Sequence, residues 1–440
     1  MQFLNLTGNS VKLNDIGKVI VFTGDKPQNI ETDDVKRSKM FQMLCIAKKF
    51  IITSASSDRM EQNLLRVQNG EMPIEEPKID VIVRGHFFSN SGYGKANRNL
   101  VYAMSRSGIR VGIETGNDAS GLNEMELQRI ARYRRSLPNA ICIDSVIPSF
   151  ASKSDYKYNI LNTTVEAASI PQQFSDACNG YDEIWTTSDY CKDIFESSGV
   201  VKPIYVIPNS IDTKLYNESA KPHEFDPHLK KFVFISVLSW SYRKGYDVLL
   251  KAYLNEFTSN DDVSLLIVSK YDGTENDEAN RYITEMTLGS YLPHIARCGR
   301  DIPEFELPRV YGACDCFVLP SRGEGFGLPY VEASLCGLPV IATNHSGHTM
   351  FLKSDNAYLF DIDKLSILPS GKTDVHYWDG QLFPELNNVT DLQRLMREVY
   401  ADIYTAKSKN TLLQQKVSQY SLESVGKLAA DRLKDIWQDI

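Results

Sequence analysis

The chain has 440 residues, of which 42% are hydrophobic and 24% are charged, as in an ordinary folded globular protein. This length exceeds what one hydrophobic core usually serves, so we expect two or three domains. The net charge of −8 argues against a broad positive surface for nucleic acid or for an anionic membrane.

The eight cysteines are scattered along the chain, and none forms a C-x-x-C pair. This pattern favours reduced thiols in a cytosol over disulfides or a zinc site. The first residues, MQFLNLTGNS, lack the basic segment and apolar run of a signal peptide. Apolar runs such as FVFISVL are too short to cross a bilayer. We therefore expect a cytoplasmic protein without a transmembrane segment.

Residues 1–78 predict a small α+β unit followed by a linker. GKVIVFTG is typical of a strand, TDDVKRSKMFQMLCIAKK of a capped amphipathic helix, and FIIT of a second short strand. The acidic, proline-bearing stretch EMPIEEPK indicates a boundary near residue 78. This unit is too small to form the body of an enzyme.

Residues 79–212 predict an α/β domain with an open sheet. Its first strand leads into the glycine loop HFFSNSGYGKANRN, as in a β-α-β unit. The expected strands are 78–85, 109–114, 181–188 and 203–209, and the expected helices are 100–108 and 192–199.

Residues 213–420 predict a second α/β domain, and residues 421–440 a final helix. The expected strands are 230–238, 263–270, 315–321 and 339–343, and the expected helices are 246–257, 329–337 and most of 390–440. Two similar halves that face each other across a cleft are the implied architecture.

Two glutamates, Glu324 and Glu332, stand eight positions apart in SRGEGFGLPYVEASLCG, after the apolar strand CFVLPS. Open α/β sheets bind ligands at the edge where such loops lie. Gly325 and Gly327 allow the backbone to approach a ligand, and a helix start favours phosphate or hydroxyl oxygens. Carboxylates accept hydrogen bonds from the vicinal hydroxyls of sugars and ribose. Each glutamate is predicted to bind one polyol. The alternative is a capping loop with exposed carboxylates.

A basic pair, Arg243 and Lys244, precedes Gly245 in SWSYRKGYDVLL, between an apolar strand and a helix. Two cations at that sheet edge can hold a diphosphate, since each charge-assisted bond contributes roughly 1.5 to 3 kcal/mol. A solvated basic pair is the alternative. A diphosphate between two polyols describes a nucleotide sugar.

These segments together resemble a family. LPRVYGACDCFVLPSRGEGFGLPYVEASLCGLPVIATNHSG, with its E-x7-E pattern, and YRKGYDVLLKAY are similar to the retaining family 4 glycosyltransferases of the GT-B fold. The resemblance covers roughly residues 80–437 and is weaker in the first half. It implies two Rossmann-like domains across a cleft, an acceptor mainly on the first, a nucleotide-sugar donor mainly on the second, and a last helix that packs back on the first.

The resemblance also implies roles for single residues. Glu324 would contact the transferred sugar and Glu332 the nucleotide ribose, while Arg243 and Lys244 would stabilise the leaving diphosphate. Glu324, Arg243 and Lys244 thus form the expected catalytic set, with no metal and no cofactor besides the donor. The other expected donor-binding residues are Gly92, Gly94, Gly325, Phe326, Gly327 and Leu328. Candidate acceptor or cleft residues are His86, Glu166 and Asn209.

Two stretches depart from the family pattern. Many members carry Gly-Arg-Leu after the first strand of the second domain, but this chain has Ser239 in the place of the arginine. Arg243 is the candidate replacement. The loop NHSGHTMFL lacks the Gly-Gly pair and the following glutamate common after the strand at 339–343.

Two other functions stay open: a nucleotide-sugar epimerase of the same fold, and a non-catalytic binding or structural module. The acceptor also stays open between a saccharide and a lipid-linked saccharide. Residues 1–75 resemble small modules of bacteriophage proteins, which adds a modified DNA base as a third acceptor, with this unit docking the partner.

Overall fold

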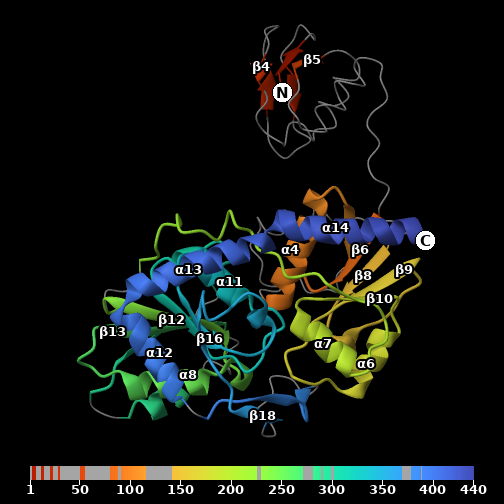
Figure 1. The fold of residues 1–440 in the computed structure, drawn as a ribbon. Helices are drawn as coiled ribbons and strands as arrows, with labels where there is room; N and C mark the ends of the chain where they lie inside the picture. Colours follow the sequence, from red (N-terminus) through yellow and green to blue (C-terminus); the bar gives the residue numbers. More distant parts are fainter. Residues whose placement is uncertain are drawn as a thin grey trace. The chain divides into compact units, whose positions relative to one another are not determined.

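The computed structural model divides into two compact units, Met1–Pro77 and Lys78–Ile440 (Figure 1). In the second unit it describes residues 80–87, 91–114, 141–224, 229–270, 281–288, 291–298, 302–368, 378–387 and 389–440, and in the first unit five short strands. Within these residues, no helix is both long and apolar enough to cross a membrane.

The first unit contains two small sheets. Three strands form one sheet in the order β4-β1-β5, and the other two pair with each other. These strands are β1 (Gln2–Asn5), β2 (Val11–Leu13), β3 (Ile20–Phe22), β4 (Gln28–Asn29) and β5 (Phe50–Ser54). The strands expected near 17–24 and 50–53 match β3 and β5, whereas the expected helix at 32–49 lies outside the described residues.

The second unit contains two parallel six-stranded sheets, so the expected α/β fold is confirmed. The first sheet has the order β11-β10-β9-β8-β6-β7. Its strands are β6 (Asp80–Gly85), β7 (Arg110–Glu114), β8 (Ile141–Ser145), β9 (Tyr158–Asn162), β10 (Glu183–Thr186) and β11 (Ile204–Val206). Its helices include α4 (Gly92–Arg106), α6 (Gln172–Asn179) and α7 (Asp189–Ser197). We call this sheet with its helices the first half.

The second sheet has the order β14-β13-β12-β15-β16-β17. Its strands are β12 (Phe232–Ser239), β13 (Val263–Lys270), β14 (His294–Cys298), β15 (Cys316–Leu319), β16 (Val340–Thr343) and β17 (Tyr358–Phe360). Its helices include α8 (Tyr246–Glu256), α10 (Leu307–Tyr311), α11 (Leu328–Leu335), α12 (Thr390–Ala401) and α13 (Ile403–Val417). We call this sheet with its helices the second half.

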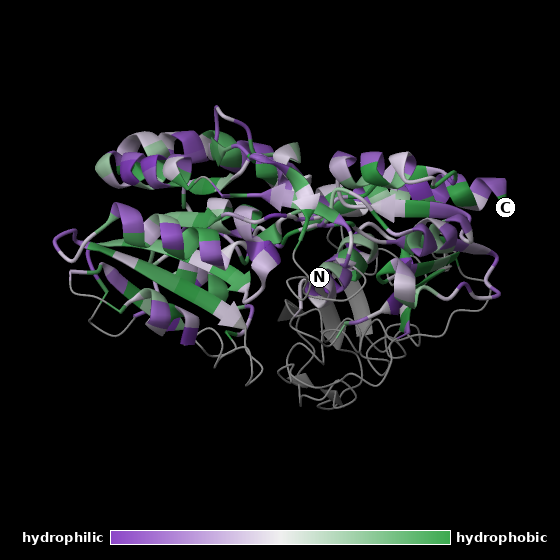
Figure 2. Cartoon of the chain, turned by 90° about the horizontal axis from the view of Figure 1, so that it is seen from below, coloured by the Kyte–Doolittle hydropathy of each residue, from purple (hydrophilic) through white to green (hydrophobic). Residues whose placement is uncertain are grey.

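The strands of the second half read as nearly continuous apolar runs because helices cover both faces of the sheet. β15 and β16 are buried along their whole length, and six of the eight residues of β12 are buried. Figure 2 shows these strands in the hydrophobic colour and the helices around them with hydrophilic stretches. This core fixes the sheet edge from which the loops of the site emerge.

The last helix, α14 (Leu422–Asp439), leaves the second half and packs along α4 of the first (Figure 1). The packing is close, since a Cβ atom on Gly426 would lie 2.2 Å from the carbonyl oxygen of Ala103. Where the chain returns to the first half it runs beside its earlier crossing, because Ile211 N donates to Tyr420 O over 2.9 Å.

A hairpin of β18 (Lys364–Ile367) and β19 (Leu382–Glu385) extends from the second half to the first. Its Trp378 ring lies edge-on to Phe174, with ring centroids 5.6 Å apart. The Ala168 amide donates to Leu382 O over 2.7 Å. The two halves are therefore joined by packing as well as by the chain crossings.

Two of the expected elements differ from the structure in their extent. The glycine loop is shorter than expected, because Gly92 and Gly94 lie in the first turn of α4, where Ser91 Oγ accepts from Gly94 N over 3.1 Å as the N-cap. The C-terminal helical tract is interrupted at Asp402, and the 3-10 turn Ser418–Tyr420 directly precedes the expected final helix at 421–440.

Candidate functional site

A cavity of about 710 Å³ opens between the two halves, at the carboxyl ends of strands from both sheets. This size suits a small-molecule ligand. Most of the residues predicted from the sequence line it: Gly92, Glu166, Asn209, Arg243, Lys244, Glu324, Gly325, Phe326, Gly327, Leu328 and Glu332. Gly94 and His86 are not among them. Gly94 N donates to Ser91 Oγ, the N-cap of α4. His86 is exposed, and its carbonyl oxygen accepts from Asn97 Nδ2 over 3.0 Å.

The loop before α11 is glycine-rich for a reason that its sequence did not reveal. A Cβ atom on Gly325 would lie 1.7 Å from Thr164 Oγ1, and one on Gly323 would lie 1.9 Å from Glu166 O. Thr187 and Ser188 also donate to Gly325 O, over 2.9 and 2.7 Å. The absence of a side chain at Gly325 thus makes room for the first half of the protein, while Gly325 also lines the cavity.

Gly327 turns the loop into α11. It has φ 93°, in the left-handed region, and it stands directly before the first helical residue, Leu328. Pro329 follows within the first turn, where a missing N–H costs no helical hydrogen bond. The start of this helix, with Gly327, Leu328 and Pro329, therefore lies at the cavity wall.

Glu324 is buried against the two predicted cations. Its Oε1 lies 2.6 Å from Lys244 Nζ and 3.9 Å from Arg243 Nη1. Burial alone would raise the pKa of Glu324, but Lys244 and then Arg243 lower it below its ordinary value. Glu324 is therefore a fixed negative charge in the cavity.

The loop after β16 holds the backbone of Glu324 through two hydrogen bonds. Ser346 Oγ accepts from Glu324 N over 3.1 Å, and Gly347 N donates to Glu324 O over 2.8 Å. Ser346 has φ 73° and ψ −167°, a conformation found almost only at glycine. It occupies the stretch in which the resemblance implies a Gly-Gly pair. The serine hydroxyl supplies a hydrogen bond that glycine cannot.

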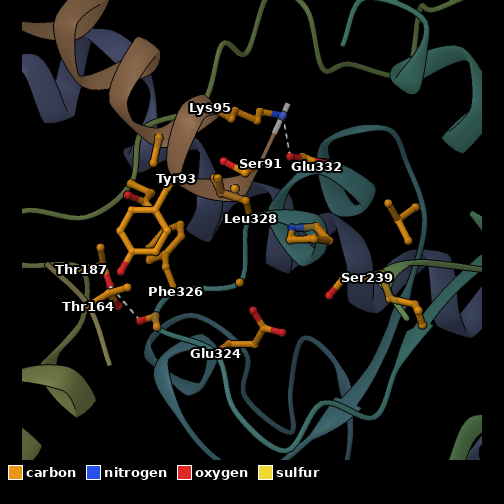
Figure 3. Close-up of a pocket in the computed structure, with 18 of the residues that line it drawn as sticks. Ser91, Tyr93, Lys95, Thr164, Thr187, Ser239, Glu324, Phe326, Leu328 and Glu332 are labelled. Atoms are coloured by element: carbon orange, nitrogen blue, oxygen red, sulfur yellow. Dashed lines mark hydrogen bonds and ion pairs between the residues drawn. The ribbon is translucent and has the colours of Figure 1, made fainter. Parts of the chain in front are cut away.

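Arg243 lies on the cavity wall and is engaged with the protein. Its Nη1 donates to Gly323 O over 2.8 Å and lies 3.3 Å from Glu166 Oε1. Ser239, which stands where the resemblance implies an arginine, also lines the cavity (Figure 3). Whether Arg243 replaces that arginine stays a prediction.

Glu332 is held by residues that the sequence reasoning missed. Its Oε1 lies 2.5 Å from Lys95 Nζ in α4, and its Oε2 accepts from Tyr311 over 3.1 Å. Lys95 also donates to Tyr216 over 2.6 Å and lies 3.3 Å from Glu304. Figure 3 shows Lys95 reaching across to Glu332 from the first half. The one local signal for Lys95 was its position directly after the glycines of SGYGK.

Burial lowers the pKa of Lys95, but the negative charges of Glu332 and then Glu304 raise it by more. The pKa of Lys95 is therefore above its ordinary value. Each predicted glutamate of the cavity thus has a lysine partner: Glu324 has Lys244, inside the second half, and Glu332 has Lys95, between the halves. No group of three histidine, cysteine or acidic side chains stands together as a metal site within the described residues.

Residues 229–366 match the family model described as glycosyl transferases group 1. O-antigen chain mannosyltransferase B of Escherichia coli is 38% identical over 79 residues, which are 18% of this chain and 20% of that protein. D-inositol 3-phosphate glycosyltransferase of Segniliparus rotundus is 28% identical over 149 residues, which are 33% of this chain and 32% of that protein. The chain thus spans a third or less of the length of these two relatives.

Solved structures match over a longer part of the chain. Sucrose-phosphate synthase of Thermosynechococcus elongatus superposes with a TM-score of 0.61 at 15% identity, covering 82% of this chain and 100% of that one. HepE of Anabaena, solved in complex with UDP and glucose, gives a TM-score of 0.57 at 15% identity and covers 81% of this chain and 100% of that one. The GT-B fold expected from the sequence is confirmed.

Proposed function

From the match of residues 229–366 to the group 1 glycosyl transferases and from the GT-B fold, we propose that the chain is a retaining glycosyltransferase. It moves a sugar from a nucleotide diphosphate sugar to a hydroxyl of an acceptor. The observation that carries this proposal is that Glu324 and Glu332 line one cavity, each paired with a lysine. Two carboxylates at a helix start suit a sugar, a diphosphate and a ribose in a row.

In this proposal the reaction passes through an oxocarbenium-like state while negative charge builds on the leaving diphosphate. Lys244, Arg243 and the positive end of the α11 helix dipole stabilise that charge, in the place where other enzymes use a metal ion. Glu324 faces the transferred sugar. The acceptor attacks the face that the diphosphate leaves, and its proton passes to a phosphate oxygen, so no enzyme nucleophile is required.

The acceptor is proposed to be a saccharide or a lipid-linked saccharide. The name of one relative supports this choice, since it mentions an O-antigen chain, whereas the name of the other mentions D-inositol 3-phosphate, a polyol phosphate. A modified DNA base is the competing acceptor. The DNA acceptor would be favoured if the chain transfers sugar to such DNA and loses this activity when residues 1–75 are deleted.

The proposal is tested by thermal melting with UDP-, GDP-, ADP-, dTDP- and CMP-linked sugars. A ligand at a hundred times its dissociation constant stabilises the folded state by about 2.7 kcal/mol, which raises Tm by a few degrees. We expect one nucleotide class to raise the Tm of the wild type, and the Glu332→Gln variant to show a smaller rise. A lack of any rise, together with no sugar transfer to a panel of saccharide acceptors, would contradict the proposed function.

A further inference from the structure

Four charged residues alternate in sign across the boundary between the halves. Arg98 and Lys95 belong to α4 of the first half, whereas Glu304 and Glu332 belong to the second. Arg98 Nη2 lies 3.2 Å from Glu304 Oε2, and Lys95 lies between the two carboxylates, 3.3 Å from Glu304 and 2.5 Å from Glu332. Lys95 and Glu332 are both largely buried, with 11% and 4% of their side-chain surface exposed.

This arrangement leaves Glu332 a defined capacity for further hydrogen bonds. A carboxylate has about four acceptor positions, two on each oxygen. Lys95 uses one position on Oε1 and Tyr311 uses one on Oε2. One position on each oxygen therefore remains for the two hydroxyls of a vicinal diol.

The position of Lys95 is itself fixed. Its Nζ donates to Tyr216 over 2.6 Å and lies 4.2 Å from the centre of that ring. A buried ion pair of this kind is weak support for a role in stability alone, because the cost of removing both charges from water offsets their attraction. Lys95 and Glu332 both line the cavity, so the pair is placed where a ligand can contact it.

We propose that Lys95 is a positioning residue for the donor. From the first half it orients Glu332 of the second half so that the carboxylate accepts hydrogen bonds from both ribose hydroxyls. This inference rests on the proposed function and deepens it. Glu332 then binds both ribose hydroxyls only when the two halves are in contact, so recognition of the donor depends on closure of the cavity.

The test is isothermal titration calorimetry on the full chain with UDP, GDP and ADP and with their 2′-deoxy forms. We expect the wild type to bind its preferred ribonucleotide at least tenfold more tightly than the 2′-deoxy form. In Lys95→Met this ratio falls below about threefold, and in steady-state assays KM for the donor rises more than kcat falls. A merely structural role would weaken both nucleotides equally. Lys153→Met, which removes an exposed lysine 3.1 Å from Asp182, is the matched control and keeps the ratio.

The outcomes separate the two proposals. A wild type that binds no nucleoside diphosphate overturns the proposed function and this inference with it. A wild type that prefers ribose, together with a Lys95→Met variant that prefers it equally, overturns the inference alone. Circular dichroism checks the folding of the variant. If Lys95→Met does not fold, Tyr216→Phe replaces it, because the loss of that hydroxyl releases Lys95 from its position. A smaller fall in the ratio is then expected, and an unchanged ratio overturns the inference.

Discussion

The two glutamates of the cavity that were predicted from the sequence are held by lysines from different parts of the fold. Lys244 ends a 3-10 turn, Tyr242–Lys244, and reaches Glu324 within the second half. Lys95 reaches Glu332 from α4 of the first half. At the scale of single residues, one pair is thus complete within the second half, while the other needs both halves.

Lys244→Ala is expected to reduce turnover at least a hundredfold. Lys244 is the cation nearest to Glu324, and loss of one charge that stabilises a transition state typically costs about a factor of 10² to 10³ in kcat. The measurement is initial rate at saturating donor. Lys251→Ala, an exposed lysine on the neighbouring helix α8, is the control and retains wild-type turnover. Near wild-type turnover in Lys244→Ala would remove Lys244 from the catalytic set.

We expect an unusual order of thermal stability among variants of Ser346. Ser346→Ala loses the hydrogen bond from Glu324 N and keeps a backbone conformation that costs about 1 to 3 kcal/mol. Ser346→Gly loses the same bond but relieves the strain. Glycine is therefore expected to give the higher Tm of the two, although alanine is closer to serine in shape. A higher Tm for Ser346→Ala would show that the strain is not carried by this residue.

Much of the candidate site could be predicted at the residue scale because its signals are local. Glu324 and Lys244 follow the ends of β15 and β12, which meet at one edge of the sheet, and Glu332 lies on the helix that directly follows the Glu324 loop. Lys95 and Glu304 could not be predicted, because their importance depends on how α4 of one half meets the loop before α10 of the other. Gly325 was predicted to contact the donor and it lines the cavity, but the sequence could not show that Thr164 occupies the space beside its Cα.

At the scale of elements, the contact between α4 and α14 depends on one residue without a side chain. A Cβ atom on Gly426 would lie 2.2 Å from Ala103 O and 2.6 Å from Ser107 Oγ. Backbone atoms cannot move aside as flexible side chains do. The two helices would have to separate to admit even a methyl group.

Gly426→Ala is therefore expected to destabilise the protein by about 1 to 3 kcal/mol despite the higher helix propensity of alanine. Thermal melting provides the measurement. Lys427→Ala changes the next, exposed position of the same helix and is expected to stay within about 0.5 kcal/mol of the wild type. Equal stability of Gly426→Ala and the wild type would mean that the helices are not in close contact.

The elements that could be predicted are those with long apolar runs or clear periodicity, such as β12, β13 and α8. β8 and β9 were not predicted, because ICIDS and YNILN are short and carry polar residues at their ends. They are strands because neighbours distant in the sequence pair with them on both sides. The hairpin β18–β19 was also missed, since its apolar partners belong to the other half.

At the scale of the whole molecule, buried histidines make stability depend on pH. His348 is fully buried in the loop behind Glu324, and its Nε2 lies 2.7 Å from Thr343 O. Burial lowers the pKa of His348 to about 4, from an ordinary value near 6.5. Between these two values the unfolded chain binds more protons than the folded one. The free energy of unfolding therefore falls as the pH drops from about 6.5 toward 4.

The wild type is expected to lose Tm between pH 7 and pH 5, with His348 contributing up to about 1.4 kcal/mol per pH unit in this range. His348→Gln removes this contribution, so its Tm falls less steeply over the same interval, whatever its Tm at pH 7. His86→Gln, at an exposed histidine, keeps the wild-type slope. An unchanged slope in His348→Gln would show that His348 does not stay neutral in the folded protein.

The return of the chain to the first half sets an order for its synthesis. The first sheet is complete at β11, which ends at Val206, but α14, which covers α4, begins only at Leu422. A ribosome that adds about 5 to 20 residues per second needs roughly 10 to 40 seconds for the segment between them. During that time Ala103 and its neighbours on α4 are not yet packed against α14. This face of α4 therefore gains its packing partner only at the end of synthesis, so the first half reaches its final stability only after the second half has been made.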